Sequence, residues 1–308
     1  MKTKGFGNIK ALVIIGGFIG ALFAIDSLTS NGNMSVFQFP GMNTPLNQNS
    51  NGNTETEAKN NSIQKSPDTQ ISTNKNTQES FEGQTFRGAS YDSYIIDLQT
   101  DDIGFFLKDK NKKNIQSFHQ LDLQLQQENK KLLFATNGGM FTSAYEPVGL
   151  YIENGQVVQP INLKQESGNF FMQPNGIFYI TKNGEAHIIP SKTFNDSLMR
   201  NMEFATQSGP MLLIDGKIHS KFGEESTNTN IRSGVGIIDD QTVVFAISNT
   251  EVNFYDFASF FQQKFGCQNA LYLDGVISEM YLPELGRYDS VGKFGVMIAV
   301  TETEKEAM

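Results

Sequence analysis

Four short polar elements with glycine follow apolar runs in this chain, and their residue types could do chemistry. They are Asn137-Gly138-Gly139, Gln207-Ser208-Gly209-Pro210, Arg232-Ser233-Gly234 and Leu273-Asp274-Gly275. Amides and hydroxyls bind sugar hydroxyls, a guanidinium binds phosphate oxygens as a fork, and a carboxylate can act as a nucleophile or a general base. A strand that stops at a polar residue and a glycine delivers that side chain to a sheet edge. We therefore expect these four strand ends to meet in one cleft.

Asp274 and Arg232 are the central candidates. Asp274 follows the apolar run Ala270–Leu273, where its carboxylate could be a nucleophile or the base for a water molecule, although an Asp-Gly turn is the commoner meaning of such a pair. Arg232 is one of four arginines in the chain, and it alone lies in a polar-glycine element. Its guanidinium suits recognition of a phosphate, and a surface salt bridge is the alternative.

Asn137 ends an apolar run and is followed by Gly138 and Gly139. Two glycines let a ligand approach the backbone and free consecutive N–H groups for an anion or a sugar hydroxyl. We therefore place Asn137 among the catalytic candidates and the two glycines among the substrate-binding ones. The alternative is a type I′ hairpin turn, which Asn-Gly ordinarily indicates.

Further substrate-binding candidates come from the remaining elements. Gln207 and Ser208, followed by Gly209, suit sugar hydroxyls or an acetamido group, and a buried structural pair is the alternative. Asn175 is included as a binding candidate, although a turn is the simpler interpretation. Ser278 could bind phosphate or end a strand.

A second carboxylate, a proton donor and a metal site are less well supported. Glu146, on an expected loop of the cleft, is a weaker candidate for a second carboxylate. His219 could donate a proton, but a solvent-facing strand position is the simpler interpretation. Together with His119 and His187 it lacks the spacing of metal ligands, so we predict no metal site and no cofactor. A divalent cation held by Asp274 and a substrate phosphate stays open.

The elements that must position these residues are mostly strands. Apolar segments of strand length are joined by pairs that indicate antiparallel hairpins: Asn154-Gly155, Asn183-Gly184, Asp215-Gly216 and Asp239-Asp240. The pattern predicts an α+β fold, with a mixed or antiparallel sheet core and a few packed helices in a single globular domain.

Two helices are expected. Asn253 can cap a segment whose aromatic residues recur at helical spacing, and Gly266 is placed to end it. A second helix is expected at about 117–129, because its Gln and Glu content favours helix. Leu121, Leu123 and Leu125 nevertheless alternate as they would in a strand.

The N-terminus has the pattern of an export signal or signal-anchor. Lys2, Lys4 and Lys10 precede the apolar run Ala11–Ile25, and no small-residue cleavage site follows, so we favour a membrane anchor over a cleaved signal peptide. The domain is thus expected outside the cytoplasm, tethered to the membrane, or secreted if the segment is cleaved. We divide the chain into this segment (1–26), a linker rich in Asn, Ser, Thr and Gln (27–85), the globular domain (86–303) and a tail (304–308).

Charge and cysteine content exclude some classes of protein. A net charge of -9 and a pI near 4.9 argue against nucleic acid as a partner, since a phosphate backbone calls for a basic face. Cys267 is the only cysteine, so it cannot form an internal disulfide, and we expect an inert buried thiol.

An ordered series of motifs resembles the phosphodiester glycosidase family, whose animal member is the mannose-6-phosphate uncovering enzyme. The motifs are Phe134–Phe141, Pro147–Leu150, Gly168–Phe171, Pro174–Gly176, Ala205–Pro210, Arg232–Gly236 and Leu271–Gly275. The resemblance covers nearly all of the globular domain and is strongest to the short bacterial single-domain branch. Where the animal enzymes carry a run of glycines after the aspartate, this chain has Val276-Ile277 before Ser278.

The resemblance implies a hydrolase that removes a sugar, such as N-acetylglucosamine, from a phosphodiester, and it makes Asp274 a catalytic carboxylate rather than a turn residue. Hydrolysis at the anomeric carbon passes through an oxocarbenium-like state, so a carboxylate is needed near that carbon and donors are needed around the departing phosphate. Two other classes stay open: a non-catalytic module that binds glycan or cell wall, and a structural partner protein held at the membrane.

Overall fold

The computed structural model describes residues 81–303, with the exception of residue 276. The expected anchor at 1–26, the linker up to residue 80 and the tail at 304–308 lie outside the described residues. β1 begins at Phe81, five residues before the domain boundary expected at residue 86. Within the described part of the chain, no helix has the length and apolarity needed to cross a membrane.

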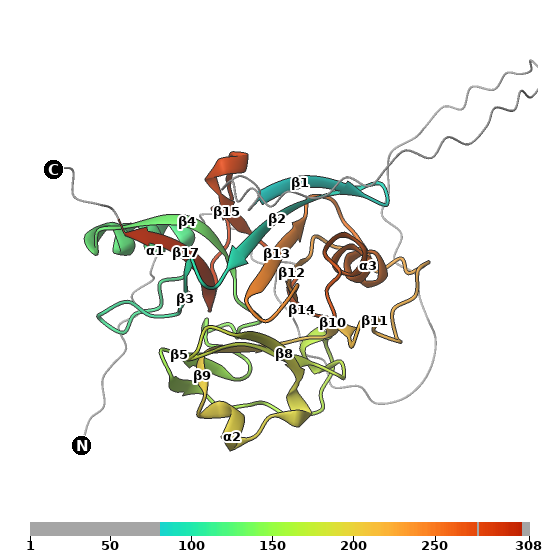
Figure 1. Ribbon diagram of the computed structural model, residues 1–308, viewed down its shortest axis with the longest axis horizontal. Coiled ribbons are helices and arrows are strands. Elements are labelled where there is room, and N and C mark those ends of the chain that lie inside the picture. Colours follow the sequence, from blue (N-terminus) through green and yellow to red (C-terminus); the bar gives the residue numbers. More distant parts are fainter. Residues whose placement is uncertain (1–80, 276, 304–308) are drawn as a thin grey trace, which may run out of the picture. The chain divides into compact units, whose positions relative to one another are not determined.

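Three antiparallel sheets make up the described part of the chain (Figure 1). In spatial order, the first sheet holds β1 (Phe81–Phe86), β2 (Ala89–Asp97), β13 (Thr242–Ser248), β12 (Ser233–Ile237), β14 (Asn269–Asp274), β10 (Met211–Ile214) and β11 (Lys217–Ile218). The second holds β16 (Arg287–Tyr288), β15 (Met280–Leu282), β4 (Lys130–Asn137), β17 (Met297–Thr303) and β3 (Asp102–Phe106). The third holds β6 (Gln156–Gln159), β5 (Tyr151–Glu153), β9 (Met202–Ser208), β7 (Gly176–Thr181) and β8 (Ala186–Pro190).

The four predicted hairpin turns are confirmed. They join β5 to β6, β7 to β8, β10 to β11 and β12 to β13. Asn154 and Gly155 have φ of 51° and 71°, and Asp215 and Gly216 have φ of 48° and 75°. Positive φ at both central residues is what a type I′ turn requires, which explains why these pairs occur there.

Both predicted helices are present. α3 (Phe254–Phe265) begins at Asn253, whose side chain accepts a hydrogen bond from the backbone N–H of Asp256, and it ends at Gly266 in the left-handed conformation. α1 (Phe118–Gln127) is capped by Ser117 and buries Leu121 and Leu125 at helical spacing. The alternation of Leu121, Leu123 and Leu125 does not indicate a strand here, because Leu123 lies on the outer face of the helix and is 40% exposed. Short helical segments complete the fold: α2 (Asp196–Met199), η1 (Asn169–Phe171), η2 (Ser191–Thr193) and η3 (Pro283–Leu285).

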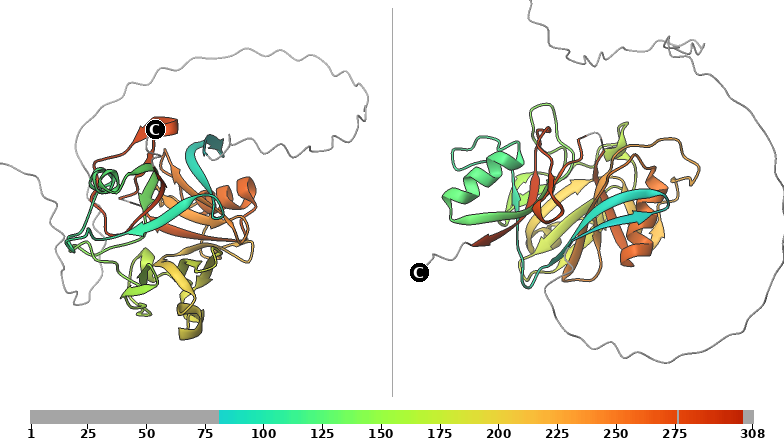
Figure 2. Two further views of the ribbon diagram at one scale, coloured as in Figure 1. Left: turned by 60° about the vertical axis from the view of Figure 1, so that its left-hand side comes forward. Right: turned by 90° about the horizontal axis from the view of Figure 1, so that it is seen from above.

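The main core lies where the three sheets meet (Figure 2). It includes Phe245 and Leu271 from the first sheet, Phe134 from the second and Phe178 from the third. α3 packs against the other face of the first sheet, and this second cluster contains Cys267. Burial raises the pKa of the Cys267 thiol to about 12, as expected for an inert core residue. The α+β fold with antiparallel sheets and a few helices is confirmed.

Candidate functional site

The four polar strand ends come together where the three sheets meet. Ser233 Oγ lies 3.1 Å from Asn137 Oδ1 and 3.3 Å from the carbonyl oxygen of Asp274, so it connects β4, β12 and β14. Ser208, at the end of β9, donates to the carbonyl oxygen of Leu273 at 3.0 Å. Ser278 Oγ lies 3.0 Å from Ser233 Oγ and 2.6 Å from the carbonyl oxygen of Asp274. Residues far apart in sequence thus form one hydrogen-bonded cluster.

Asp274 carries the ionisable group of this cluster. Its carboxylate accepts a hydrogen bond from the backbone N–H of Gly275 at 2.6 Å, and no cation forms an ion pair with it among the described residues. Burial raises the pKa of Asp274 to about 6, with the Gly275 hydrogen bond opposing that shift. A carboxyl group with a pKa near 6 changes its charge close to neutral pH, which suits a group that exchanges protons or attacks as an anion.

Arg232 directly precedes Ser233, which pairs with Asp274 across β12 and β14. Its side chain is completely buried and stacks on Phe254, with its central carbon 3.7 Å from the ring centroid. Nε donates to the carbonyl oxygen of Val252 at 2.8 Å, and Nη2 donates to the carbonyl oxygen of Asn228 at 2.9 Å. The surface salt bridge that was the alternative for Arg232 is absent among the described residues, since no carboxylate there pairs with it. Desolvation lowers the pKa of the guanidinium.

Tyr272, which was not among the candidates predicted from the sequence, contacts Arg232 and shares β14 with Asp274. Its hydroxyl lies 3.5 Å from Nη1 of Arg232 and hydrogen-bonds with the Asn169 side chain. Burial raises the pKa of Tyr272, Arg232 opposes that shift, and the charge of Asp274 adds to it. A Cβ on Gly275 would overlap the Tyr272 hydroxyl, which explains the glycine after the aspartate. Tyr272 therefore lies in the electric fields of both Arg232 and Asp274.

Asn137 is fully buried, and the Asn-Gly turn that was its alternative does not form. The N–H of Gly138 instead donates to the carbonyl oxygen of Val296 at 2.8 Å. Asn137 Oδ1 is within hydrogen-bond distance of Ser233 and Glu279, while its buried Nδ2 has no partner among the described residues. A buried amide donor without an acceptor is costly, so this N–H is available to a ligand that enters the cluster.

Gly138 and Gly139 are explained by packing within the protein. A Cβ on Gly138 would lie 2.5 Å from Cγ1 of Val296. Gly139 has φ of 133°, and a Cβ there would lie 3.0 Å from Oγ1 of Thr206. Thr206 Oγ1 also donates to the carbonyl oxygen of Gly138 at 2.6 Å. The backbone at these two glycines is thus closely approached, as expected. The groups that approach it are Val296 and Thr206 of this chain rather than a ligand.

Gln207 is a structural residue in this arrangement. Its Oε1 accepts from the backbone N–H groups of Leu150 and Asn162, and its Nε2 donates to the carbonyl oxygen of Asn162 and to Ser191 Oγ. These four hydrogen bonds use all the donor and acceptor positions that an amide normally fills. Gln207 therefore holds the 162 and 191 segments against β9, which is the buried structural role named as its alternative.

Gly209 and Asn175 are packed against each other, since a Cβ on Gly209 would lie 2.5 Å from that of Asn175. Asn175 is buried; its Nδ2 donates to the carbonyl oxygen of Phe170 at 2.8 Å, while Oδ1 has no partner among the described residues. The segment containing η1 is fixed in this way beside the cluster.

The acidic residue that adjoins the cluster is Glu279, through its backbone N–H, rather than Glu146. Glu146 pairs with Lys108 at 3.1 Å on a partly exposed loop, and no hydrogen bond joins it to the cluster among the described residues. The N–H of Glu279 lies 3.4 Å from Asn137 Oδ1, and burial raises the pKa of its carboxyl group. Its Oε1 accepts from the N–H of Gly292, and its buried Oε2 has no partner among the described residues. The signal in the sequence was its position five residues after Asp274.

His219 is not the solvent-facing residue that its strand position indicated. It is 2% exposed, with Nε2 3.0 Å from the carbonyl oxygen of Gln173 and Nδ1 accepting from the N–H of Lys221. Desolvation lowers the pKa of its ring. Both nitrogens are used within the protein, which leaves none to donate a proton to a ligand. No group of three His, Cys, Asp or Glu side chains in the described ranges is arranged to hold a metal ion.

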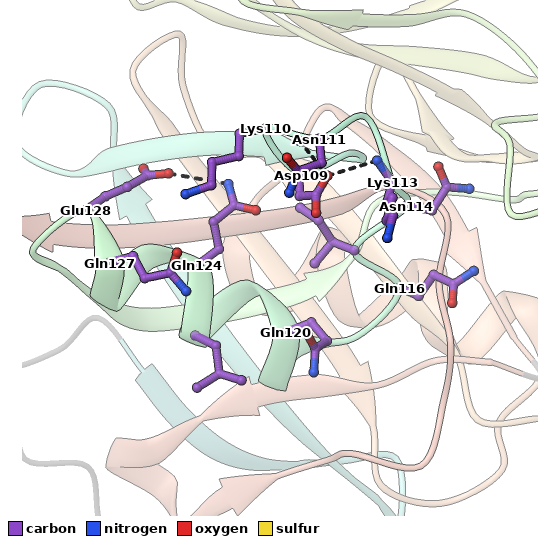
Figure 3. Close-up of a pocket in the computed structure, with 12 residues that line it drawn as sticks. Asp109, Lys110, Asn111, Lys113, Asn114, Gln116, Gln120, Gln124, Gln127 and Glu128 are labelled. Carbon is purple, nitrogen blue, oxygen red and sulfur yellow. Dashed lines mark hydrogen bonds between the residues drawn. The ribbon is translucent and has the colours of Figure 1, made fainter.

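A separate cavity of about 520 Å³ lies between α1 and the loop before it (Figure 3). Its polar lining includes Asn111, Asn114, Gln120 and Gln124. None of the candidate site residues lines it, so this cavity is distinct from the Asp274 cluster.

The chain is similar in sequence and in fold to known proteins. A model of the phosphodiester glycosidase family matches residues 130–299. Over 190 residues, or 62% of this chain, the sequence is 36% identical to YigE, an uncharacterized protein of Escherichia coli strain K12, and the match covers 73% of YigE. The catalytic domain of zebrafish N-acetylglucosamine-1-phosphodiester α-N-acetylglucosaminidase, auto-inhibited by its pro-peptide, is similar in fold. That match has a TM-score of 0.50 at 15% identity and covers 73% of this chain and 82% of that domain. A hypothetical protein from Synechocystis gives a TM-score of 0.45 at 12% identity, covering 72% and 61% of the two chains.

Proposed function

Because this chain belongs to the phosphodiester glycosidase family, we propose that it hydrolyses a glycosyl 1-phosphodiester, such as an N-acetylglucosamine-1-phosphodiester, on a glycan or glycopolymer outside the cytoplasm. The observation that carries this proposal is Asp274 at the end of β14: the pKa of its carboxyl group is raised to about 6, and the hydroxyls of Ser233 and Ser278 lie within hydrogen-bond distance of its backbone carbonyl oxygen. The ordered motifs that suggested the family in the sequence are the segments that build this cluster.

In the proposed reaction, water adds to the anomeric carbon and the bond from that carbon to the phosphate oxygen breaks. The products are the free sugar and a phosphate monoester. Ionised Asp274 acts either as the nucleophile or as the base that takes a proton from the water, and it stabilises the oxocarbenium-like state in both cases. Phosphate leaves readily, so stabilising its charge contributes more than protonating it strongly.

Arg232 and Tyr272 supply that stabilisation in our proposal. The sequence predicts that Arg232 holds the phosphate directly as a fork. Its Nε and Nη2 groups, however, already donate to backbone carbonyl oxygens, so in this proposal it serves as a positioning residue. Its Nη1 group orients the Tyr272 hydroxyl, which lies next to Gly275. In the proposed reaction that hydroxyl donates a hydrogen bond to the phosphate.

Asn137 completes the proposed substrate contacts, and Ser278 has a supporting role. The unpartnered Nδ2 of Asn137 donates to a sugar hydroxyl or an acetamido oxygen, and Ser278 holds the turn after Asp274. Gly138, Gly139, Gln207, Ser208 and Gly209 shape the site through packing and hydrogen bonds within the chain.

The test is release of free sugar from N-acetylglucosamine-1-phosphodiester compounds by the purified protein. Asp274→Asn should fold normally and lose turnover by at least about a hundredfold, since it removes the ionisable group. Asp215→Asn is the matched control, because it makes the same change in another Asp-Gly pair on an exposed turn. Full turnover by Asp274→Asn would remove Asp274 from the mechanism. Sugar binding without product in the wild type would indicate the non-catalytic module instead.

The location outside the cytoplasm is a separate part of the proposal. It is supported by the basic residues and the apolar run Ala11–Ile25 at the N-terminus. Cell fractionation of the full chain and of a variant lacking residues 1–26 tests it. We expect the full chain in the membrane fraction with the domain accessible to added protease, and recovery of the full chain in the cytosol would contradict this.

A further inference from the structure

Exposed apolar side chains gather on the segment that follows Asp274. Eight large apolar residues are exposed among the described residues, and four of them lie within 277–291. These four are Ile277, Leu285, Tyr288 and Val291, of which Tyr288 is 60% and Val291 is 96% exposed. We call residues 277–292 the apolar hairpin; it is built on β15, η3 and β16 and lies at the edge of the second sheet (Figure 1).

The apolar hairpin is continuous with the Asp274 cluster. Ile277 precedes Ser278, whose hydroxyl lies 2.6 Å from the carbonyl oxygen of Asp274. Glu279 accepts a hydrogen bond from the N–H of Gly292, which ties Val291 to the same turn. The hairpin therefore starts at the cluster, and the exposed residues Ile277 and Val291 are the chain neighbours of Ser278 and Gly292, which make these two contacts.

The hairpin is held in place by an ionic network. Arg287 pairs with Asp92 on β2 at 2.7 Å and with Asp289 at 2.6 Å, and it hydrogen-bonds with Asn249. Because this network fixes β16 and the adjoining turn of the hairpin to the first sheet, the backbone that carries the exposed apolar side chains is pre-organised to bind a ligand.

We propose that the apolar hairpin binds the hydrocarbon part of the group on the far side of the phosphate, so that the substrate is a glycosyl 1-phosphodiester of an amphiphilic alcohol. This rests on the proposed function. Exposed apolar surface beside a site favours an apolar ligand. The charges around the hairpin select the substrate over an anionic bilayer as the occupant, because Glu279, Glu284 and Asp289 outnumber Arg287 within it.

The test compares synthetic N-acetylglucosamine-1-phosphodiesters that carry methyl, butyl or octyl groups, each below its micelle concentration. Full burial of one methylene changes an equilibrium constant by about fourfold, and partial burial by about twofold. We therefore expect kcat/KM for the octyl diester to exceed that for the methyl diester by at least about tenfold. Val291→Ser and Ile277→Ser should each lower this octyl-to-methyl ratio by at least about threefold.

Val157→Ser on β6 is the matched control, because the exposed fraction of Val157 lies between those of Ile277 and Val291 but Val157 belongs to another sheet. It should leave the ratio unchanged. Calorimetry also measures the affinities of Asp274→Asn for the octyl and methyl diesters. The same measurement is made on the double variant that adds Val291→Ser, so the outcome does not depend on turnover.

Equal kcat/KM and equal affinity for the octyl and methyl diesters would overturn the inference, and hydrolysis of the methyl diester would then still support the proposed function. Octyl preference in binding without any turnover would keep the inference and reject the function. If neutral phosphatidylcholine vesicles bind the protein through Val291 while monomeric diesters show no preference for chain length, the hairpin docks on a membrane and the inference is wrong.

Discussion

Ser233 and Asp274 face each other across β12 and β14, with Ser233 Oγ 3.3 Å from the carbonyl oxygen of Asp274. The ladder shifts register directly after this pair, between Ser233 and Gly234. A bulge at a strand end re-aims side chains without breaking the sheet. This pair therefore joins the ends of β12 and β14, and the Ser233 hydroxyl also reaches Asn137 of the second sheet.

The ionisation of Asp274 should oppose folding above pH 6. Its pKa rises from 3.8 in a free side chain to about 6 in the folded protein, so the folded state holds the proton more tightly than the unfolded state. Stability should fall as the pH rises from about 4 to 6 and stay lower above that, by up to about 3 kcal/mol for this shift. Asp274→Asn should thus be more stable than the wild type at pH 8 and about equal at pH 4. Urea unfolding at both pH values checks this, and an equal difference at both would contradict it.

Activity should follow the same ionisation in the opposite direction. Because the proposed mechanism needs Asp274 as an anion, kcat/KM should decline as the pH falls through about 6. The measurement is a pH profile of sugar release. A profile that is flat between pH 5 and 8 would show that this carboxylate does not control the rate.

Ser233→Ala should weaken both the cluster and the fold. The Ser233 hydroxyl lies within hydrogen-bond distance of Asn137, Asp274 and Ser278, and its loss should cost about 1 to 2 kcal/mol of unfolding free energy. Ser259→Ala is the control, because the buried Ser259 hydroxyl has no partner among the described residues. Chemical denaturation of both variants should show a lower free energy of unfolding only for Ser233→Ala. An equal decrease in both variants would mean that the hydroxyl contacts of Ser233 do not contribute to stability.

Arg232→Lys should be strongly destabilising although it keeps the charge. Lysine cannot reach the carbonyl oxygens of Val252 and Asn228 together or stack flat on Phe254. We expect a loss of about 2 to 4 kcal/mol from buried carbonyls and charge left without their partners. Arg200→Lys, at an exposed position, should change stability by less than about 0.5 kcal/mol. Urea unfolding of both variants checks this. An unfolding midpoint for Arg232→Lys equal to that of the wild type would show that the guanidinium contacts are dispensable.

Gly138→Ala should cost about 1 to 3 kcal/mol, because its Cβ would lie 2.5 Å from Val296. Gly223→Ala is the control, since nothing in the described chain lies within 4 Å of the Cβ it would add. Thermal unfolding separates the two. If Gly138→Ala unfolds at the wild-type temperature but loses activity, Gly138 is needed for ligand approach, as the sequence first suggested, rather than for packing.

Much of the fold was predictable because its signals are local. The Asn154-Gly155 and Asp215-Gly216 turns require φ values that those residues adopt readily, and the Asn253 and Gly266 caps follow from the unpaired groups at helix ends. The ordered motifs likewise predicted the family. Local signals failed where burial decided the outcome: Leu123 alternated in a way typical of strands but lies on the exposed face of α1, and His219 turned out to be buried.

The roles within the site depend on contacts between distant segments. That Asn137, Gln207, Arg232 and Asp274 end or border strands could be predicted from neighbouring residues alone, because hydrophobic period and glycine position are local properties. The folded chain was needed to learn that Gln207 uses its amide within the protein, that the Tyr272 hydroxyl contacts Arg232, and that the backbone of Glu279 adjoins the cluster. Burial and hydrogen-bond partners set the pKa and the free donors of a side chain, and those partners come from strands far away in the chain.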